Sequence, residues 1–359
     1  MFARAEPTIV PNDMGAEQAT PPLGGPPYES SGAAPDSVKA CLAQVRSQFG
    51  EEIEAIESEL SRLVRLGTAP GTDAAAHLLE AGGKRVRPLT VILSAACFGK
   101  PNQTVRDVAV VAELVHLATL LHDDVIDDGK ERRGRPTSRR IWGNAISVLS
   151  GDMLLTLALE RTAASAPGFV LHDLFATLRR LVDGEILQLR GRGTLELDEA
   201  SYFRIIRGKT ASLFEWAARA GAACAGATPQ NCAALGEFGA RVGLAFQLVD
   251  DVLDYCGDPR DIGKALLGDL AEGKLTLPLI RTLEKTPAIR PHVHAARTGD
   301  HESALLVADA VRASGTCDSV RALAREQSSL ALEPLKTLPP SAARDLLASI
   351  ARELAARAS

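Results

Sequence analysis

The sequence predicts an all-α domain in which long helices pack around a central one. Past residue 36, segments rich in Ala, Leu, Arg and Glu follow one another between short Gly and Pro breaks. No alternating pattern of useful length indicates a β-strand, and no internal repeat is evident. With 359 residues, 46% of them hydrophobic, the chain can bury the core of one large domain.

Long helices are predicted in chain order between these breaks. They span residues 37–66, 104–128, 140–164, 169–191, 199–225 and 230–255. Thr228 and Pro229 have the residue types of an N-cap and a first helical position, so they are expected to open the last helix. Residues 37–359 are therefore predicted to form a single helical domain.

The first 36 residues are predicted to be a disordered tail. Residues 1–35 contain seven prolines and are mildly acidic. A signal peptide needs an apolar centre and a transit peptide is basic, so neither is indicated. No apolar run reaches 18 residues without a charge, which argues against a transmembrane helix.

Charge and cysteine content exclude several classes of protein. The net charge is −5 and no long basic block occurs, which argues against nucleic acid as a partner. Six cysteines are scattered without CxxC or paired spacing. This pattern favours reduced thiols in a cytoplasmic protein over a disulfide scaffold or a zinc site.

Four aspartates fall within six residues of the stretch LLHDDVIDDGKERRGRPT, at the end of the predicted helix 104–128. Asp123 and Asp127 share a helix face, whereas Asp124 lies about 100° away. A helix C-terminus carries partial negative charge, so carboxylates there cost stability unless a cation is bound. Mg²⁺ fits such oxygen ligands and also shares phosphate oxygens. A solvated acidic helix end is the simpler interpretation of one such cluster.

The same pattern recurs in the stretch FQLVDDVLDYCGDP, again at the end of a long apolar helix. Asp250, Asp251 and Asp254 have the spacing of the first cluster. Two such helix ends facing each other would form a carboxylate cage for several Mg²⁺ ions, and the cage would suit a diphosphate. The repetition favours this hypothesis over two solvated helix ends.

Basic residues accompany glycines in three further motifs, GGKRVRP, RGKTAS and IGKALLGDLAEGKLTLPLI. Glycine allows close backbone approach, and Lys and Arg bind phosphate oxygens. Gly208 lies inside the predicted helix 199–225, where it costs about 1 kcal/mol relative to Ala. A kink that aims Lys209 and close packing against a neighbouring helix both explain it. Taken singly, the other two motifs are more often turns with solvated charges.

In this combination the sequence resembles the trans-isoprenyl diphosphate synthases. The match runs from Leu78 to Ile280 and includes, in order, GGKxxRP, DDxxD followed by Arg-Arg-Gly, GKT, FQxxDDxxD and GKxxxxDLxEGKxTLPL. HDDVIDDGKERRG and GNAISVLSGD bring it nearest to the long-chain, polyprenyl branch. One position departs: between Lys264 and Asp269 the family often has a Gly that here is Leu266 or Leu267, with Gly268 instead.

The resemblance implies the isoprenoid synthase fold, a helical bundle around a central cavity, and a homodimer. It implies a prenyltransferase that joins isopentenyl diphosphate to an allylic diphosphate. The allylic substrate would ionise between the aspartate clusters, with its charge stabilised by about three Mg²⁺ ions and by cationic side chains. The isopentenyl double bond would attack the cation, and proton loss would regenerate a longer allylic diphosphate. The cavity must exclude water, which would quench the cation.

The resemblance also assigns roles by position. Asp123 and Asp127 would bind Mg²⁺ from one side and Asp250 from the other, with Asp124, Asp251 and Asp254 in support. The allylic diphosphate would be held by Arg132, Lys209, Gln247 and Lys264, with Lys274 nearby and Thr210 close to the reacting carbon. Isopentenyl diphosphate would be held by Lys84, Arg87, His116 and Arg133.

Product length is predicted from the helix that carries Asp123. Thr119 and Ala118 lie one turn before it, and Val115 and Ala112 come next at helical spacing. Short-chain members of the family have bulky aromatics near the first two positions, whereas both are small here. A growing tail could therefore pass, which predicts a product longer than geranylgeranyl diphosphate. Alternatively, these residues are small to let a neighbouring helix pack closely.

The sequence leaves four alternatives to this function. A synthase of farnesyl or geranylgeranyl diphosphate is the alternative within the same family, with a shorter product. A class I terpene cyclase needs no isopentenyl site, so Lys84, Arg87 and Arg133 count against it. A non-catalytic subunit would be expected to lose an aspartate cluster, and a structural helical protein leaves the motifs unexplained.

Overall fold

The computed structural model describes residues 38–194, 197–257 and 267–357, all of which belong to one unit that begins at Gly32. The first half of this unit contains α1 (Val38–Leu63), α2 (Gly71–Glu80), α3 (Val86–Ala96), α4 (Gln103–Ile126), β1 (Glu131–Arg132), β2 (Arg135–Pro136), α5 (Ser138–Ser165) and α6 (Gly168–Thr194). The second half contains α7 (Glu199–Ile206), the π-helical turn η1 (Arg207–Ala211), α8 (Ser212–Cys224), α9 (Pro229–Cys256), α11 (Gly268–Ala271), α12 (Leu277–Lys285), the 3₁₀ turn η2 (Pro287–Ile289), α13 (Arg290–Arg297), α14 (His301–Ala313), α15 (Thr316–Leu335) and α16 (Ala342–Arg357). The predicted tail, residues 1–36, lies outside the described residues.

The all-α prediction is confirmed for the described residues, and the helices begin where local chemistry favours it. Asn102 caps α4 by accepting a hydrogen bond from the backbone N–H of Val105 at 2.9 Å. Thr228 caps α9 through Asn231 N–H at 3.2 Å, and Pro229 occupies the first turn, as the sequence predicts. The short hairpin β1–β2 is an addition that the sequence did not reveal, because each strand has only two residues.

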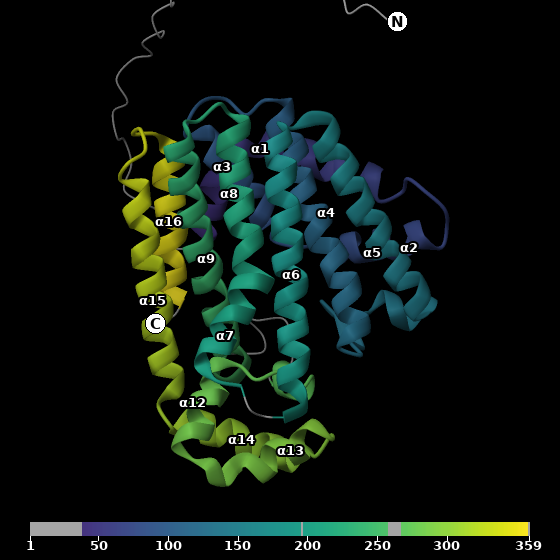
Figure 1. Ribbon diagram of the computed structural model, residues 1–359, viewed down its shortest axis with the longest axis vertical. Helices are drawn as coiled ribbons and strands as arrows, with labels where there is room; N and C mark the ends of the chain where they lie inside the picture. The colour runs from purple at the N-terminus through teal and green to yellow at the C-terminus, as the bar shows by residue number, and fades with distance from the viewer. Residues whose placement is uncertain (1–37, 195–196, 258–266, 358–359) are drawn as a thin grey trace, which may run out of the picture. The chain divides into compact units, whose positions relative to one another are not determined.

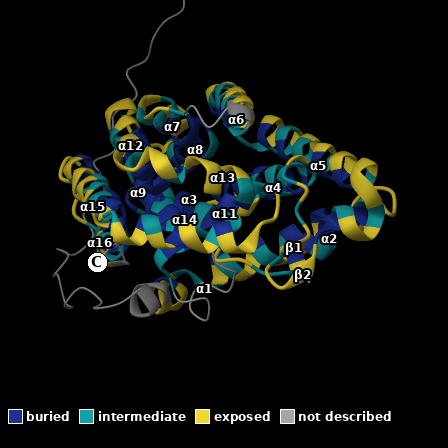
Figure 2. Cartoon of the chain, turned by 90° about the horizontal axis from the view of Figure 1, so that it is seen from below, coloured by how far each residue is buried: buried dark blue, intermediate teal, exposed yellow. Residues whose placement is uncertain are grey.

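The core lies between the long helices (Figure 1). Helix α8 packs against α3, α4, α6 and α9, and α9 also packs against α15. Figure 2 shows buried residues gathered around α3, α8 and α9. Helices α13 and α14 run across one end of the bundle (Figure 1). The ends of α4 and α9 that carry the aspartates are therefore held in place by the packing of these helices.

The predicted helix 199–225 is interrupted by the π-helical turn η1, which contains the GKT motif. A Cβ atom on Gly208 would lie 2.6 Å from the carbonyl oxygen of Arg180, and one on Gly184 would lie 2.8 Å from the backbone nitrogen of Lys209. Close packing against α6 therefore explains Gly208. The sequence also allowed a kink at Gly208, and the structure has a π-helical turn there. Such turns are frequent at functional sites.

Helices α5 and α6 expose an apolar face. Its most exposed large side chains are Leu149, Phe169, Phe175, Val182 and Ile186. By length and composition alone, α5 and α9 could each cross a membrane. Both helices contain charged residues, so neither is an uncharged apolar run of 18 residues. The α9 window is 61% buried inside the unit and the α5 window only 28%, so α9 is a core helix and α5 has an uncovered face.

Candidate active site

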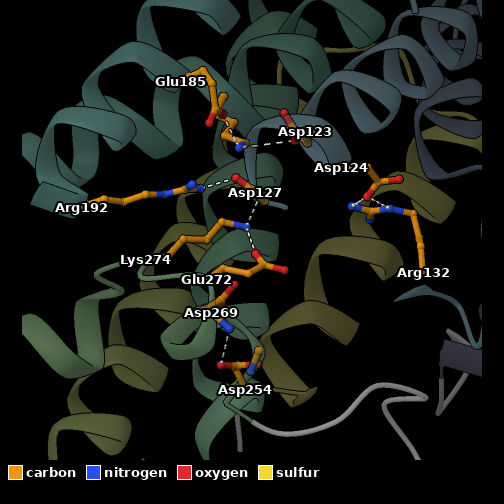
Figure 3. A network of polar contacts seen from close by, with 12 residues as sticks. Asp123, Asp124, Asp127, Arg132, Glu185, Arg192, Asp254, Asp269, Glu272 and Lys274 are labelled. Carbon is orange, nitrogen blue, oxygen red and sulfur yellow. Dashed lines mark hydrogen bonds and ion pairs between the residues drawn. The ribbon is translucent and has the colours of Figure 1, made fainter. Parts of the chain in front are cut away.

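The first aspartate cluster is surrounded by cationic side chains from other elements (Figure 3). Asp123 forms an ion pair with Lys209 at 3.4 Å. Asp127 pairs through one oxygen with Arg192 and through the other with Lys274, whose Nζ lies 2.9 Å away. The sequence predicted that these carboxylates need a bound cation. In this structure, lysine and arginine side chains supply that compensation.

Asp124 faces away from Asp123 and Asp127, as the helical spacing predicts (Figure 3). Its Oδ1 accepts a hydrogen bond from Arg132 Nε at 2.9 Å and forms an ion pair with Nη2 at 2.8 Å. Burial raises the pKa of Asp124 despite the Arg132 charge. For Asp127, burial acts in the same direction, but the Lys274 charge and the Arg192 hydrogen bond outweigh it and lower the pKa. Asp127 is therefore held as a carboxylate.

The GKT turn connects α4 to α9. Lys209 reaches Asp123 and also forms an ion pair with Glu185 of α6. The hydroxyl of Thr210 donates a hydrogen bond to Gln247 Oε1 at 2.8 Å. The predicted site residues Lys209, Thr210 and Gln247 thus lie together, and Lys209 points at the first aspartate cluster.

Two aspartates of the second cluster are turned into the protein. Asp251 is buried, and its two oxygens accept hydrogen bonds from Gln247 Nε2 at 2.8 Å and from the Tyr202 hydroxyl at 2.6 Å. Burial and the Asp269 charge raise its pKa. Asp254 is fully buried and accepts hydrogen bonds from the backbone N–H groups of Gly268 and Asp269 at 3.1 and 3.2 Å. Both therefore support neighbouring elements in this structure, and Asp250 is the member that is only half buried.

The segment from Gly268 to Lys274 links the two clusters (Figure 3). Asp254 binds its first residues, and Lys274 at its end reaches Asp127. Leu267, just before it, has a φ of +64°, a left-handed conformation that glycine adopts without strain. The glycine that the family often has in this loop fits this position. Leu266 and the predicted site residue Lys264 lie outside the described residues.

A second group of cations surrounds the GGK loop. The Arg87 guanidinium lies 4.8 Å from the centre of the Phe214 ring, and burial lowers its pKa to about 10. His116 is close to several arginines. Its burial, followed by the charges of Arg87 and Arg133, lowers its pKa well below 6.5, so the imidazole is neutral near pH 7. Lys84 is exposed at the loop.

Arg132 ends strand β1 and Arg133 lies in the turn of the hairpin, so their side chains have different partners. Arg132 binds Asp124 of the first aspartate cluster. Arg133, in the turn, places its guanidinium nitrogens about 3.2 Å from where a Cβ of Gly83 would be, so any side chain there would crowd it. Adjacent residues in sequence thus point to two different cationic groups.

Sequence reasoning missed five charged residues that shape the site. Arg85 has a φ of +49° and binds Glu57 at 2.7 Å and the buried Glu113 at 2.8 Å, which fixes the GGK loop. Glu185 holds Lys209, and Arg192 holds Asp127. No spacing rule could have found these partners, because they lie on helices far from each other in sequence.

The residues predicted to line the product tail are mostly packed. Ala112 and Val115 are fully buried, and Ala118 is 2% exposed, within the main hydrophobic core. Thr119 is half buried, and its hydroxyl donates a hydrogen bond to the His116 carbonyl at 2.7 Å. Small residues also allow close helix packing, and in this structure Ala112, Val115 and Ala118 pack within the core.

The first aspartate cluster has the donor atoms of a Mg²⁺ site. Among the described residues, no three His, Cys, Asp or Glu side chains already converge as a ready-made metal site. Asp123 and Asp127 nevertheless offer only carboxylate oxygens, the donors that Mg²⁺ prefers, and these oxygens already bind positive charges. The donor set fits the ion, and metal would take the place of side-chain cations.

Comparison with known proteins identifies the family. The polyprenyl synthetase model matches residues 71–313. The chain belongs to the polyprenyl synthetase family. An all-trans-nonaprenyl-diphosphate synthase of Rhodobacter capsulatus is 35% identical over 317 residues, which cover 87% of this chain and 95% of that protein. An octaprenyl diphosphate synthase of Escherichia coli is 35% identical over 302 residues, covering 83% and 91%.

Structural comparison agrees with this assignment. A polyprenyl synthase from Caulobacter crescentus, solved with calcium and isoprenyl diphosphate, has a TM-score of 0.84 and 33% identity. The match covers 89% of this chain and 98% of that protein. The predicted family and its all-α isoprenoid synthase fold are thereby confirmed.

Proposed function

We propose that this member of the family is a Mg²⁺-dependent polyprenyl diphosphate synthase that elongates an allylic diphosphate with isopentenyl diphosphate. The observation that carries the proposal is the division of cations into two groups. Arg132, Lys209 and Lys274 pair with the first aspartate cluster, whereas Arg87 and Arg133 lie beside the GGK loop. Two diphosphate substrates require two such sites. A terpene cyclase, which ionises a single diphosphate, would leave the second group without a purpose.

Mg²⁺ would be held by Asp123 and Asp127 on one side and by Asp250 on the other. When bound, it stabilises the negative charge that develops on the departing diphosphate. Asp124, Asp251 and Asp254 would support these ligands by fixing Arg132, Gln247 and the loop before Lys274. The number of ions, about three by resemblance, is part of the proposal.

The allylic diphosphate would be bound by the cations that now neutralise the first aspartate cluster. Lys209 and Lys274 are held close to Asp123 and Asp127, so they are positioned for oxygens that approach those carboxylates. Arg132, Gln247 and Lys264 complete this site by resemblance. Thr210, fixed by Gln247, would lie near the reacting carbon.

Isopentenyl diphosphate would be bound by Lys84, Arg87, His116 and Arg133. The neutral His116 donates a hydrogen bond without adding charge, while Arg87 and Arg133 supply the positive potential. Phe214 covers one face of Arg87 and limits water there. Arg85, Glu57 and Glu113 would position this loop rather than touch the substrate.

The protein would act as a homodimer. The exposed apolar side chains of α5 and α6, including Leu149 at 60% and Val182 at 58% exposure, lie on neighbouring helices. Burying this face against a second copy would remove apolar surface from water. Product length beyond geranylgeranyl diphosphate is supported by the named relatives, with Thr119 and Ala118 as the first residues to meet the tail.

The function is tested by incubating the protein with labelled isopentenyl diphosphate, an allylic primer and Mg²⁺. We expect label in prenyl products, no turnover with a chelator present, and a loss of about 100-fold or more in Asp123→Asn. Lys84→Ala and Arg87→Ala should raise the KM for isopentenyl diphosphate, whereas Lys209→Ala should act mainly on the allylic substrate. Cyclised hydrocarbon without uptake of label would instead identify a cyclase.

A further inference from the structure

Arg192, in the last turn of α6, has no role in the family motifs considered above, yet it lies inside the candidate allylic site (Figure 3). Its guanidinium Nη2 is hydrogen-bonded to Oδ1 of Asp127. Only 14% of the Arg192 side chain and 5% of the Asp127 side chain are exposed. A buried pair at a predicted metal ligand means that metal binding and this ion pair compete for the same oxygen.

Asp127 binds two cations, Arg192 and Lys274, and these differ in their other side-chain partners. Lys274 also binds Glu272, so it keeps a counter-ion when Asp127 is engaged elsewhere. Within the described part of the chain, Asp127 is the one side-chain partner of Arg192, and the buried Nε–H of Arg192 has no acceptor. Displacement would therefore leave a buried guanidinium in need of an anion.

The surroundings of Arg192 are rich in positive charge. Arg297 of α13 donates a hydrogen bond from Nη2 to the main-chain oxygen of Arg192, which anchors the end of α6. The Arg297 Nε lies 3.0 Å from where a Cβ of Gly273 would be, next to Lys274. Burial and the Arg192 charge lower the pKa of Arg297. Cations gathered in this way repel one another, and a polyvalent anion would relieve the repulsion.

We propose that Arg192 is a further diphosphate-binding residue of the allylic site, for which Asp127 is a temporary partner in the ligand-free enzyme. Engagement of Asp127 by metal releases the guanidinium, whose forked donors then bind diphosphate oxygens. Arg192 therefore weakens metal binding in the absence of diphosphate and strengthens diphosphate binding once metal is present. The inference rests on the proposed function of the Asp123–Asp127 cluster.

The competing explanation is that Arg192 only stabilises the structure, as a cation near the C-terminus of α6. The two roles predict different effects of replacing Arg192 on the affinities for metal and for diphosphate. A residue with only a structural role would, when replaced, affect metal and diphosphate binding in the same direction. If Arg192 competes with metal for Asp127 and then binds diphosphate, its replacement must raise the metal affinity and lower the diphosphate affinity.

The test uses the full chain and two calorimetric titrations. In the first, Mn²⁺ is added without diphosphate, and Arg192→Gln should bind it about tenfold more tightly than wild type, because a competing cation is gone. In the second, inorganic pyrophosphate is added at saturating Mg²⁺, and the same variant should bind it about tenfold more weakly. Arg192→Lys keeps the charge, so its Mn²⁺ affinity should stay near wild type while its pyrophosphate affinity falls.

Arg190→Gln is the matched control, because Arg190 is exposed on the same helix and its loss removes the same net charge. It should change neither affinity. The inference is overturned if Arg192→Gln behaves like Arg190→Gln, or if both affinities move together. Arg192→Lys decides the question alone if Arg192→Gln does not fold: unchanged pyrophosphate binding would refute the role. Failure of wild type to bind pyrophosphate with Mg²⁺ would instead refute the proposed function.

Discussion

Asp250 and Asp254 belong to one motif, but their surroundings differ. Asp254 is fully buried and accepts two backbone hydrogen bonds at the start of α11, next to Leu267 in its left-handed conformation. A branched side chain in that conformation costs about 1–2 kcal/mol, which surrounding contacts must offset. Asp250 is half buried, as expected of a residue that meets a ligand. The spacing alone could not separate the two roles.

This difference predicts separate effects on stability and activity. Asp254→Ala leaves two backbone donors without their acceptor, so the free energy of unfolding should fall by about 2 kcal/mol. Asp250→Ala should reduce turnover by orders of magnitude while the Tm changes much less. Thermal unfolding followed by circular dichroism measures both variants. Equal losses of Tm would contradict the assignment.

His116 predicts how stability depends on pH. In the unfolded chain its imidazole is protonated as the pH falls through about 6.5, whereas burial and nearby arginines keep the folded form neutral. The unfolded state therefore binds more protons below pH 6.5, so the free energy of unfolding falls there until the lowered folded pKa is reached. Above pH 6.5 the effect is absent.

His116→Gln removes the titration of this imidazole. The Tm of the variant should therefore fall less than that of wild type between about pH 7.5 and about pH 5.5. Comparing the two proteins cancels the titration of other groups, such as Asp124 and Glu185. The same loss of Tm in both proteins would show that His116 is not held neutral.

At the scale of elements, the close packing of η1 against α6 determines where the GKT turn places Lys209. Gly184 and Gly208 allow the two backbones to approach, and Lys209 then reaches Asp123 and Glu185. The sequence predicted an irregularity at Gly208 but not the residue on α6 that meets it. A helical pattern reports which residues share a face, whereas the partner of that face depends on tertiary packing.

Gly208→Ala should therefore lower the free energy of unfolding by about 1–3 kcal/mol and reduce turnover, because its Cβ would lie 2.6 Å from the Arg180 carbonyl. Gly50→Ala is the matched control in α1, where no atom lies within 4 Å of the new Cβ. That change should be neutral or stabilising by about 0.5–1 kcal/mol. Urea unfolding compares the two, and a neutral Gly208→Ala would disprove the close crossing.

Across the whole described unit, the family motifs predicted the fold, because they are local patterns with a fixed order. They also include residues that the structure brings together, such as Thr210 and Gln247. Contacts between distant segments were not predictable from one sequence. Arg192 meets Asp127 from α6, and the Sγ atoms of Cys256 and Cys317, which are free thiols, lie 3.0 Å apart although 61 positions separate them. The small buried residues Ala112 and Ala118 of α4 show the same limit, since a small side chain fits both a cavity and a close helix crossing.

The apolar face of α5 and α6 predicts a homodimer that one charge can disrupt. Leu149→Lys should shift the protein towards the 37.9 kDa monomer, since an uncompensated charge would be buried in the interface. Ser329→Lys, at an exposed polar position of α15 and therefore outside this face, should leave the assembly intact. Sedimentation velocity reports the mass of each variant. A wild-type monomer would show that this face has another use.

Chromatography of the prenyl products made by the wild-type protein tests the central claim most directly. With an allylic primer, Mg²⁺ and excess isopentenyl diphosphate, we predict a linear all-trans polyprenyl diphosphate longer than geranylgeranyl diphosphate. A product that stops at farnesyl diphosphate would contradict the long-chain assignment, and no incorporation of isopentenyl units would contradict the two-site account itself.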